Sequence, residues 1–229
     1  MISKPSPVQE QLLTLADDKM VKQMTKQSTL FPEKQTPILN NLKLSEAQGI
    51  AHQVKSTVAT HCERIEVAGS IRRQRPKVHD IDFVVVTRSD AEWLKISEEL
   101  KRLKAKPSCQ GSAVIKALLP CQNGLFQVDF YRAQTSNFGI NLLIRTGSAD
   151  HNMWLAGFAM SKGLRIRYSQ GLFKDGSVIS GSEERGVFEA LELPFPSPSD
   201  REVADGKPIW QLQVERNYGK FWRSFEKKG

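Results

Sequence analysis

Two aspartates separated by one residue, Asp80 and Asp82, form the part of this sequence best suited to chemistry. They open an apolar run that has the composition of a β-strand. Because alternate residues of a strand share a face, the two carboxylates lie side by side, with Ile81 turned toward the core. Adjacent carboxylates repel each other, and a divalent cation such as Mg²⁺, which takes oxygen ligands, relieves that repulsion. The pair predicts a metal site, although a half-buried strand with a solvated face also carries such pairs.

A Gly-Ser pair, Gly69-Ser70, precedes the aspartates and is followed by Arg72 and Arg73. Glycine lets backbone amides approach phosphate oxygens closely, and a guanidinium offers forked donors to the same oxygens. Together with the two acids, this segment predicts a metal-dependent site that handles phosphate groups.

The composition favours a globular protein with a polyanionic partner. Of the 229 residues, 39% are hydrophobic, and 33 Lys and Arg against 25 Asp and Glu give a formal net charge of +8. Basic charge favours nucleic acid, because each neutralised phosphate adds affinity, although a merely soluble basic protein would have the same composition. The sequence contains no apolar run of membrane-spanning length and no signal-peptide pattern, so we expect an intracellular protein that does not contact a membrane.

The elements that position the two acids follow from the spacing of apolar residues. We predict a helix over about 45–60, capped by Ser45, and a second over about 90–104. In the second helix, four residues are expected to face inward: Ala91, Leu94, Ile96 and Leu100. Strands are predicted at 64–68 and 80–87, the second of which begins with the acids.

A third acid lies in a predicted hairpin. Two strand-like runs, 113–119 and 125–132, flank the turn signal Gln122-Asn123-Gly124, and the second run contains Asp129. Asp129 shares one face of its strand with Gln127 and Tyr131. If this strand lies beside the strand of the first two acids, the third carboxylate completes a two-metal site.

The second half of the chain is predicted to be helical with one hairpin. The helices are 137–145, 149–161 and 183–191, and the hairpin covers 164–179. Thr146-Gly147-Ser148 separates the first two helices. Residues 1–43 are interpreted as a polar extension with one helix-like stretch, and 206–229 as a basic, aromatic tail.

Three blocks in this order are familiar. Gly69-Ser70 with the two arginines before Asp80-x-Asp82 is the first, Val128-Asp129 the second, and Arg145-Thr146-Gly147-Ser148 with Asn152 the third. The chain resembles the family X DNA polymerases, which are DNA polymerase beta-like nucleotidyltransferases, over roughly residues 44–203. The first block alone indicates the wider nucleotidyltransferase superfamily, and the Thr-Gly-Ser block narrows it to family X.

The resemblance implies an α+β fold. A nucleotidyltransferase palm with a mixed β-sheet flanked by helices would occupy 44–135, and a small α/β thumb-like lobe would occupy 136–205. The form would be a reduced palm and thumb, lacking the lyase and helix-hairpin-helix domains of larger members.

The same resemblance assigns roles to residues. Asp80, Asp82 and Asp129 would be the catalytic residues and the ligands of two Mg²⁺ ions, for which Mn²⁺ can substitute. The nucleotide-binding set would be Gly69, Ser70, Arg72, Arg73, Ile144, Arg145, Thr146, Gly147 and Asn152. Two members have open alternatives, because Arg72 also suits a surface ion pair and Asn152 also suits a solvated helix amide.

The sequence departs from the family near the nucleotide. Ile144 and Arg145 stand where many members have an aromatic pair that crowds the sugar 2′ position, so selection against ribonucleotides is open. Ala149 and Ala156 replace side chains that contact bases in some relatives, which indicates modest fidelity. Gln127 stands where an arginine often orients the third aspartate.

The implied activity is that of a DNA-directed DNA polymerase, which adds a deoxynucleotide from a dNTP to a primer 3′-hydroxyl and fills short gaps during repair. The expected partners are primer-template or gapped DNA and a dNTP, with rNTP use open, and the protein is expected to be a monomer. Further nucleic-acid contacts are predicted at Arg165, Arg167, Lys220 and Arg223. The alternatives are a template-independent terminal or ribonucleotide transferase and a non-catalytic nucleotide or nucleic-acid binding module.

Overall fold

The centre of the palm-like lobe (residues 37–134) is a five-stranded sheet with the strand order β2-β4-β7-β6-β5. A computed structural model of the chain describes residues 37–204 and 206–211. Strands β4 and β7 are parallel and the other neighbours are antiparallel, so the predicted mixed sheet is confirmed. The strands are β2 (Cys62–Val67), β4 (Ile81–Thr87), β5 (Lys106–Gln110), β6 (Val114–Cys121) and β7 (Gly124–Arg132).

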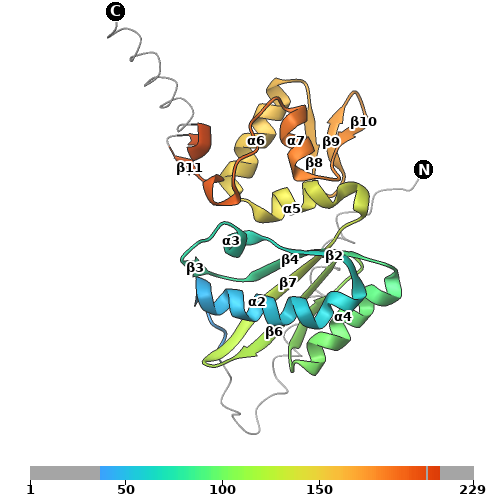
Figure 1. Cartoon of the computed structure of the whole chain (residues 1–229), viewed down its shortest axis with the longest axis vertical. Coiled ribbons are helices and arrows are strands. Elements are labelled where there is room, and N and C mark those ends of the chain that lie inside the picture. The colour runs from blue at the N-terminus through green and yellow to red at the C-terminus, as the bar shows by residue number, and fades with distance from the viewer. Residues whose placement is uncertain (1–36, 205, 212–229) are drawn as a thin grey trace, which may run out of the picture. The chain divides into compact units, whose positions relative to one another are not determined.

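Two helices, α2 (Leu44–Val58) and α4 (Asp90–Arg102), lie across one face of this sheet (Figure 1). Their inner faces and the sheet share one cluster of buried apolar side chains. Helix α2 begins one residue before the predicted cap, because the Glu46 carboxylate accepts the backbone N–H of Lys43 at 3.2 Å. Ser45 therefore lies inside the first turn, and its prediction as the cap is wrong.

The inner face of α4 is centred on Trp93 rather than on Ala91 and Leu94. Ile96 and Leu100 are buried as predicted, but Ala91 is exposed and Leu94 is 50% exposed. The indole of Trp93 is 1% exposed and donates its N–H to the Gly111 carbonyl at 2.9 Å. Burying this large ring removes much apolar surface from water while its N–H keeps a partner, and this orients the helix.

The hairpin of β6 and β7 is confirmed, with Cys121 paired to Gly124 across a two-residue turn. Strand β5 was not predicted. All five of its residues are exposed, so its sequence shows no apolar alternation, and it pairs only with β6 at the edge of the sheet. Its Pro107 suits an edge, where a missing N–H breaks no ladder.

Residues 37–43 belong to the palm-like lobe, although the sequence analysis assigned them to the N-terminal extension. The Leu39 N–H donates to the Leu125 carbonyl at 2.8 Å. Strand β1 (Leu42–Lys43) pairs with β3 (Lys77–Val78), just before the first two acids. The rest of the extension lies outside the described residues.

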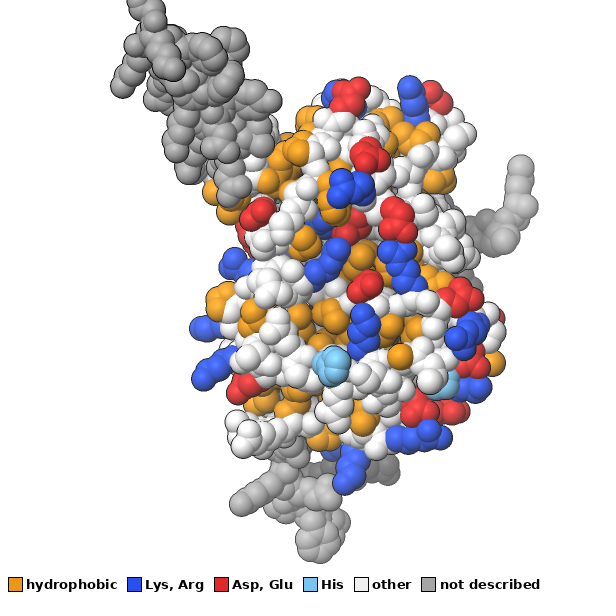
Figure 2. Space-filling model, viewed as in Figure 1, with side chains coloured by type: hydrophobic (Ala, Val, Ile, Leu, Met, Phe, Trp, Pro, Cys, Tyr) orange, Lys and Arg blue, Asp and Glu red, His pale blue; other side chains and the backbone are white. Residues whose placement is uncertain are grey.

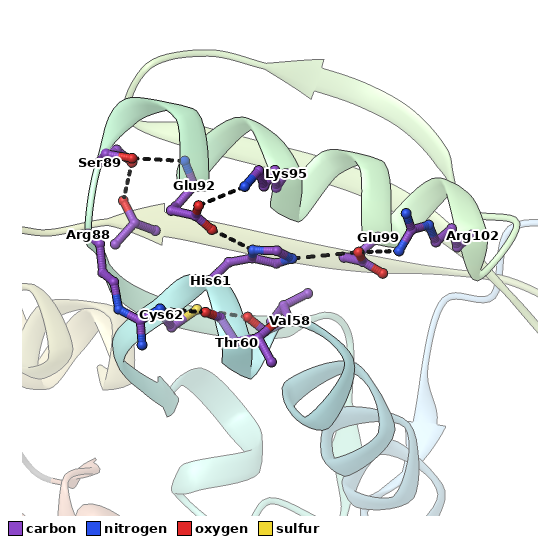
Figure 3. A network of polar contacts seen from close by, with 11 residues as sticks. Val58, Thr60, His61, Cys62, Arg88, Ser89, Glu92, Lys95, Glu99 and Arg102 are labelled. Atoms are coloured by element: carbon purple, nitrogen blue, oxygen red, sulfur yellow. Dashed lines mark hydrogen bonds and ion pairs between the residues drawn. The ribbon is translucent and has the colours of Figure 1, made fainter.

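A polar network fastens the end of α2 to α4 (Figure 3). His61, in the short 3-10 helix η1 (Ala59–His61), lies between two carboxylates of α4. Its Nδ1 is 2.6 Å from Glu92 and its Nε2 is 3.6 Å from Glu99. Arg88 donates to the Thr60 carbonyl at 2.9 Å from the loop before α4. These contacts hold together the two segments that precede β2 and follow β4.

The thumb-like lobe (residues 138–204) has helices α5 (Phe138–Thr146), α6 (Ala149–Ser161) and α7 (Glu184–Ala190) around its own apolar cluster. The predicted hairpin is a three-stranded antiparallel sheet instead, made of β8 (Arg165–Arg167), β9 (Gly171–Lys174) and β10 (Ser177–Ser180). The extra reversal passes through Ser169, whose φ of 66° is not a conformation that its residue type predicts. The α/β character of this lobe is confirmed.

A third apolar cluster joins the two lobes, because Phe138 and Leu142 of α5 pack with Val84 and Val86 of β4. The strand that contains Asp82 therefore also supports the helix that ends at Thr146. Among the described helices, none combines the length and the apolar character needed to cross a membrane.

Candidate active site

Asp80, Asp82 and Asp129 come together at one end of the β4/β7 pair. Asp82 and Asp129 are directly opposite each other in the parallel register, and Asp80 immediately precedes β4. One carboxylate oxygen from each residue lies within 4.8 Å of the other two. The expectation that the strand of Asp129 adjoins the strand of the other acids is confirmed.

Asp82 and Asp80 lie in an environment that disfavours their ionised forms. Burial raises the pKa of Asp82 to about 7, and the negative charges of Asp80 and Asp129 act in the same direction. Burial and the charge of Asp129 also raise the pKa of Asp80. Since each shift reflects poorly compensated negative charge, the cluster would gain free energy from a bound cation.

Asp129 is the most enclosed of the three, with 1% of the residue exposed, and three side chains donate to it. Lys116 Nζ lies 2.5 Å from Oδ2, and the Tyr131 hydroxyl donates to the same oxygen at 3.1 Å. Gln127 Nε2 lies 3.0 Å from Oδ1 and 3.1 Å from Oδ2. Gln127 thus orients the third aspartate, at the position where many family members have an arginine.

The Gly-Ser turn packs against Asp82. Gly69 begins the short helix α3 (Gly69–Arg72) with a φ of +57°, and a Cβ at this position would lie 2.1 Å from Oδ2 of Asp82. Only glycine fits both the backbone angle and the close approach. The hydroxyl of the next residue, Ser70, is buried and has no hydrogen-bond partner within the described part of the chain. A buried orphan hydroxyl beside acids suits a polar ligand.

Replacing Gly69 with alanine is therefore expected to displace the Asp82 carboxylate. A shift of about 1 Å in a reacting group can lower a rate about a hundredfold, and we expect the rate of the reaction at this site to fall by up to about that factor. Single-turnover rates of that reaction would measure the loss. The matched control is Gly157→Ala on α6, where a Cβ meets nothing within 4 Å, so its rate should be unchanged. Equal rates for both variants would contradict the close packing.

The second turn brings Arg73 and Asn152 together at Gly147, which has a φ of +66°. The Arg73 guanidinium donates to the Thr146 carbonyl through Nη1 and to Glu202 through Nε at 3.0 Å. Asn152 donates from Nδ2 to the Ile144 carbonyl at 2.7 Å, while its Oδ1 is buried and unpartnered among the described residues. The turn, Arg73 and Asn152 form one wall of the site.

Arg72 points away from this wall into an ion-pair network. Its guanidinium lies 2.5 and 2.8 Å from the carboxylate of Glu184 and also donates to the Thr146 hydroxyl at 2.8 Å. Arg201, which is fully buried, contacts the same carboxylate at 2.7 Å. Of the two open alternatives for Arg72, the structure shows an ion pair, and the pair is half-buried rather than on the surface.

The donor set fits a hard divalent cation. Three carboxylates converge within 4.8 Å, and oxygen-only donors are those that Mg²⁺ and Mn²⁺ accept. The residues present could hold such an ion.

Comparison with known proteins agrees with the resemblance to family X DNA polymerases. The family model described as DNA polymerase beta thumb matches residues 141–202. The chain is 29% identical over 169 residues to DNA polymerase/3'-5' exonuclease PolX of Bacillus subtilis (strain 168). This match covers 72% of this chain and 29% of that protein. It is 29% identical over 77 residues to DNA polymerase IV of Saccharomyces cerevisiae (strain ATCC 204508 / S288c), which covers 34% of this chain and 13% of that protein. The chain is therefore similar in sequence to DNA polymerases of family X.

This family X-like chain spans less than a third of the length of either curated relative. Ile144 and Arg145, the two residues that differ from the family before the Thr-Gly-Ser turn, have different surroundings. Ile144 packs against the apolar cluster of the thumb-like lobe. Arg145 is exposed and lies over the ring of Tyr131, 3.6 Å from its centroid, where its charge acts to lower the pKa of Asp82. Arg145 is therefore the member of the pair that lies near the acids.

Two of the four predicted nucleic-acid contacts lie on the thumb-like lobe of the family X-like chain. Arg165 and Arg167 are exposed on β8 of the thumb-like lobe, and Arg167 lies over the Phe173 ring. Lys220 and Arg223 fall outside the described residues. On the face drawn in Figure 2, acidic and basic side chains are interspersed over both lobes, and ion pairs such as Arg64–Glu183 place opposite charges together.

Four residues of the site were not anticipated: Lys116, Glu184, Arg201 and Glu202. The hairpin register identifies Lys116, because a two-residue turn places it opposite Asp129. The other three lie in the second half of the chain and meet the site only through tertiary packing.

Proposed function

We propose that this family X-like protein is a DNA-directed DNA polymerase that extends a primer by one nucleoside monophosphate from a dNTP, using two Mg²⁺ ions, and that it fills short gaps during repair. The observation that supports this proposal best is the convergence of three carboxylates, one of which packs against the Gly69 turn. The names of its relatives, both DNA polymerases, agree with it.

Asp80, Asp82 and Asp129 would hold the metal ions. Bound divalent cations supply charge compensation for the attacking and leaving oxygens of an in-line phosphoryl transfer. In that transfer the primer oxygen forms a bond to the α-phosphorus, the bond to pyrophosphate breaks, and the hydroxyl proton passes to solvent water. Asp129 would orient the primer hydroxyl, because its own carboxylate is held in place by Gln127 and Tyr131.

The triphosphate would lie against the Gly69-Ser70 turn. The Ser70 hydroxyl, which has no partner among the described residues, can donate to a phosphate oxygen, and Arg73 contacts the second turn at the Thr146 carbonyl. Thr146 and Gly147 would lie under the sugar, and Asn152 would face the base. Arg72 would act indirectly, because its guanidinium holds Glu184 and the Thr146 hydroxyl.

Gap filling by the full chain tests the proposal. We expect incorporation of the templated dNTP on a duplex with a one-nucleotide gap, dependent on Mg²⁺ or Mn²⁺ and abolished by EDTA. Binding of dNTP and DNA without incorporation of any nucleotide would favour the binding-module alternative, although binding alone does not require three converging acids.

A second candidate keeps the chemistry and changes the substrate to ribonucleotides or to an untemplated end. It is favoured by the position of Arg145, because a flexible cation on Tyr131 does not crowd a 2′-hydroxyl as a fixed aromatic ring does. We expect the dNTP to rNTP preference in kcat/KM to stay below about a hundredfold, the range that steric pockets give. Incorporation on blunt ends, compared with gapped DNA, separates untemplated from templated transfer.

A further inference from the structure

The ammonium group of Lys116 contacts one carboxylate of the aspartate cluster, where a metal ion would otherwise supply positive charge. It lies on β6 directly opposite Asp129 on β7, so the backbone register delivers its ammonium group to that carboxylate. The two side chains are 37% and 1% exposed, and the ammonium nitrogen is 2.5 Å from Oδ2. The other nearby cations lie differently, because Arg145 rests on the Tyr131 ring and Arg73 donates to Glu202 and the Thr146 carbonyl.

The oxygen that Lys116 contacts is already crowded. Oδ2 of Asp129 accepts from Lys116, Tyr131 and Gln127, whereas a carboxylate oxygen offers about two lone pairs. Within the described part of the chain, Oδ1 accepts from Gln127 alone. A divalent cation that binds Asp129 therefore competes with donors at either oxygen, and the competitor with a full positive charge is Lys116.

The Lys116 side chain can leave Asp129 by rotation about its own bonds. The ammonium is a single charge on a flexible four-carbon stem, and more than a third of the side chain already reaches solvent. The divalent ion brings twice the charge to three clustered carboxylates. Without either cation, Asp129 would be a buried carboxylate with no charged partner, which is a costly arrangement.

We propose that Lys116 is the resident counter-cation of the aspartate cluster, which pairs with Asp129 in the metal-free protein and leaves it when a divalent cation binds. The inference rests on the proposed function, because it takes the cluster to be a divalent-cation site. Lys116 then stabilises the metal-free fold and opposes metal binding, and the two effects are linked, since each cation weakens the binding of the other.

Titration of the full chain with Mn²⁺, without nucleotide or DNA, tests the exchange through the electron paramagnetic resonance signal of the free ion. Lys116→Met is expected to tighten the Mn²⁺ dissociation constant by at least about fivefold, which is the lower end of usual coupling between two ligands. Its melting temperature in EDTA should fall below that of the unmodified protein, and Mn²⁺ should raise it by a larger increment.

The controls separate charge from shape. Lys116→Arg keeps the charge and should bind Mn²⁺ within about twofold of the unmodified protein, which is below the smallest usual coupling. Lys101→Met removes the same charge from the exposed end of α4 and should change nothing. If Lys116→Met does not fold, Lys116→Gln, which keeps a donor but no charge, should show the same tightening.

Two results would overturn the inference: Mn²⁺ affinity that is unchanged or weaker in the neutral Lys116 variants, or equal tightening in Lys116→Arg. Neither result touches the proposed function, provided that Asp129→Asn still weakens Mn²⁺ binding. If the protein binds no Mn²⁺, or if Asp129→Asn binds it unchanged, the metal site and the proposed function fail together with the inference.

Discussion

Replacement of Asp129 by asparagine is expected to lower the rate of primer extension at least about a thousandfold, equivalent to about 4 kcal/mol of transition-state stabilisation. The carboxylate is 1% exposed and faces Asp82 across the parallel strand pair. Asparagine keeps the volume but removes the negative charge that a metal ion and the primer hydroxyl require. Single-turnover extension on gapped DNA with saturating dNTP would measure the chemical step.

The matched control for this change is Asp175→Asn. Asp175 is an exposed turn residue between β9 and β10, and its φ of 47° is a conformation that asparagine also tolerates. This variant should extend primers at the unmodified rate. Activity in Asp129→Asn within tenfold of that rate would show that another site performs the transfer.

Replacement of Glu184 by glutamine is expected to destabilise the folded chain by about 3 kcal/mol at pH 7. The side chain is 6% exposed and pairs with Arg72 and with Arg201, which is 0% exposed. The neutral amide leaves a buried guanidinium without its charged partner, and breaking a buried pair from one side typically costs about 3–5 kcal/mol. Urea unfolding at constant pH gives the difference in the free energy of unfolding.

The pH dependence of this effect has a definite sign. Burial acts to raise the pKa of Glu184, but the hydrogen bonds and charges of Arg72 and Arg201 outweigh it, and the net pKa lies below its usual value of 4.5. The unfolded chain therefore binds more protons than the folded chain at acidic pH. The stabilisation is fully present above about pH 4.5 and is lost as the pH falls through the folded pKa, so the two proteins should converge there.

The control for Glu184 is an ion pair that lies in solvent. Glu192 contacts Lys162 at 2.7 Å, and its side chain is 79% exposed. Glu192→Gln should leave the unfolding midpoint unchanged, because exposed pairs contribute little. A similar midpoint for both variants would mean that the buried Arg72–Glu184–Arg201 network stabilises the fold no more than an exposed ion pair does.

The sequence alone determined the catalytic candidates and the elements that hold them. Asp80 and Asp82 share a strand face by the two-residue period, and the alternation around Asp129 with the turn at Gln122-Asn123 predicted its hairpin. These are local patterns, which depend on residues close together in the chain. For the same reason helix α6 was predicted with its observed bounds, 149–161.

Local patterns failed where packing between distant residues decided the outcome. The inward face of α4 depends on the Trp93 indole reaching Gly111, and strand β5 exists only because β6 offers an edge. The chain reverses at Ser169, whose positive φ is not predicted by the residues around it. In each case the competing local preference was small compared with the apolar burial or backbone pairing gained.

Tertiary structure alone decided how the charges of the site are distributed. By residue type, Arg72 and Arg73 are equivalent, yet Arg72 is bound to Glu184, more than a hundred residues later in the sequence, while Arg73 lies on the Gly147 turn. The raised pKa of Asp82 requires both burial and the neighbouring strand. The sequence determined which acids are candidates for the metal site, because strand periodicity is a local property. Only the fold decided which cation each acid meets, because electrostatic energy depends on distance and burial in space rather than on separation along the chain.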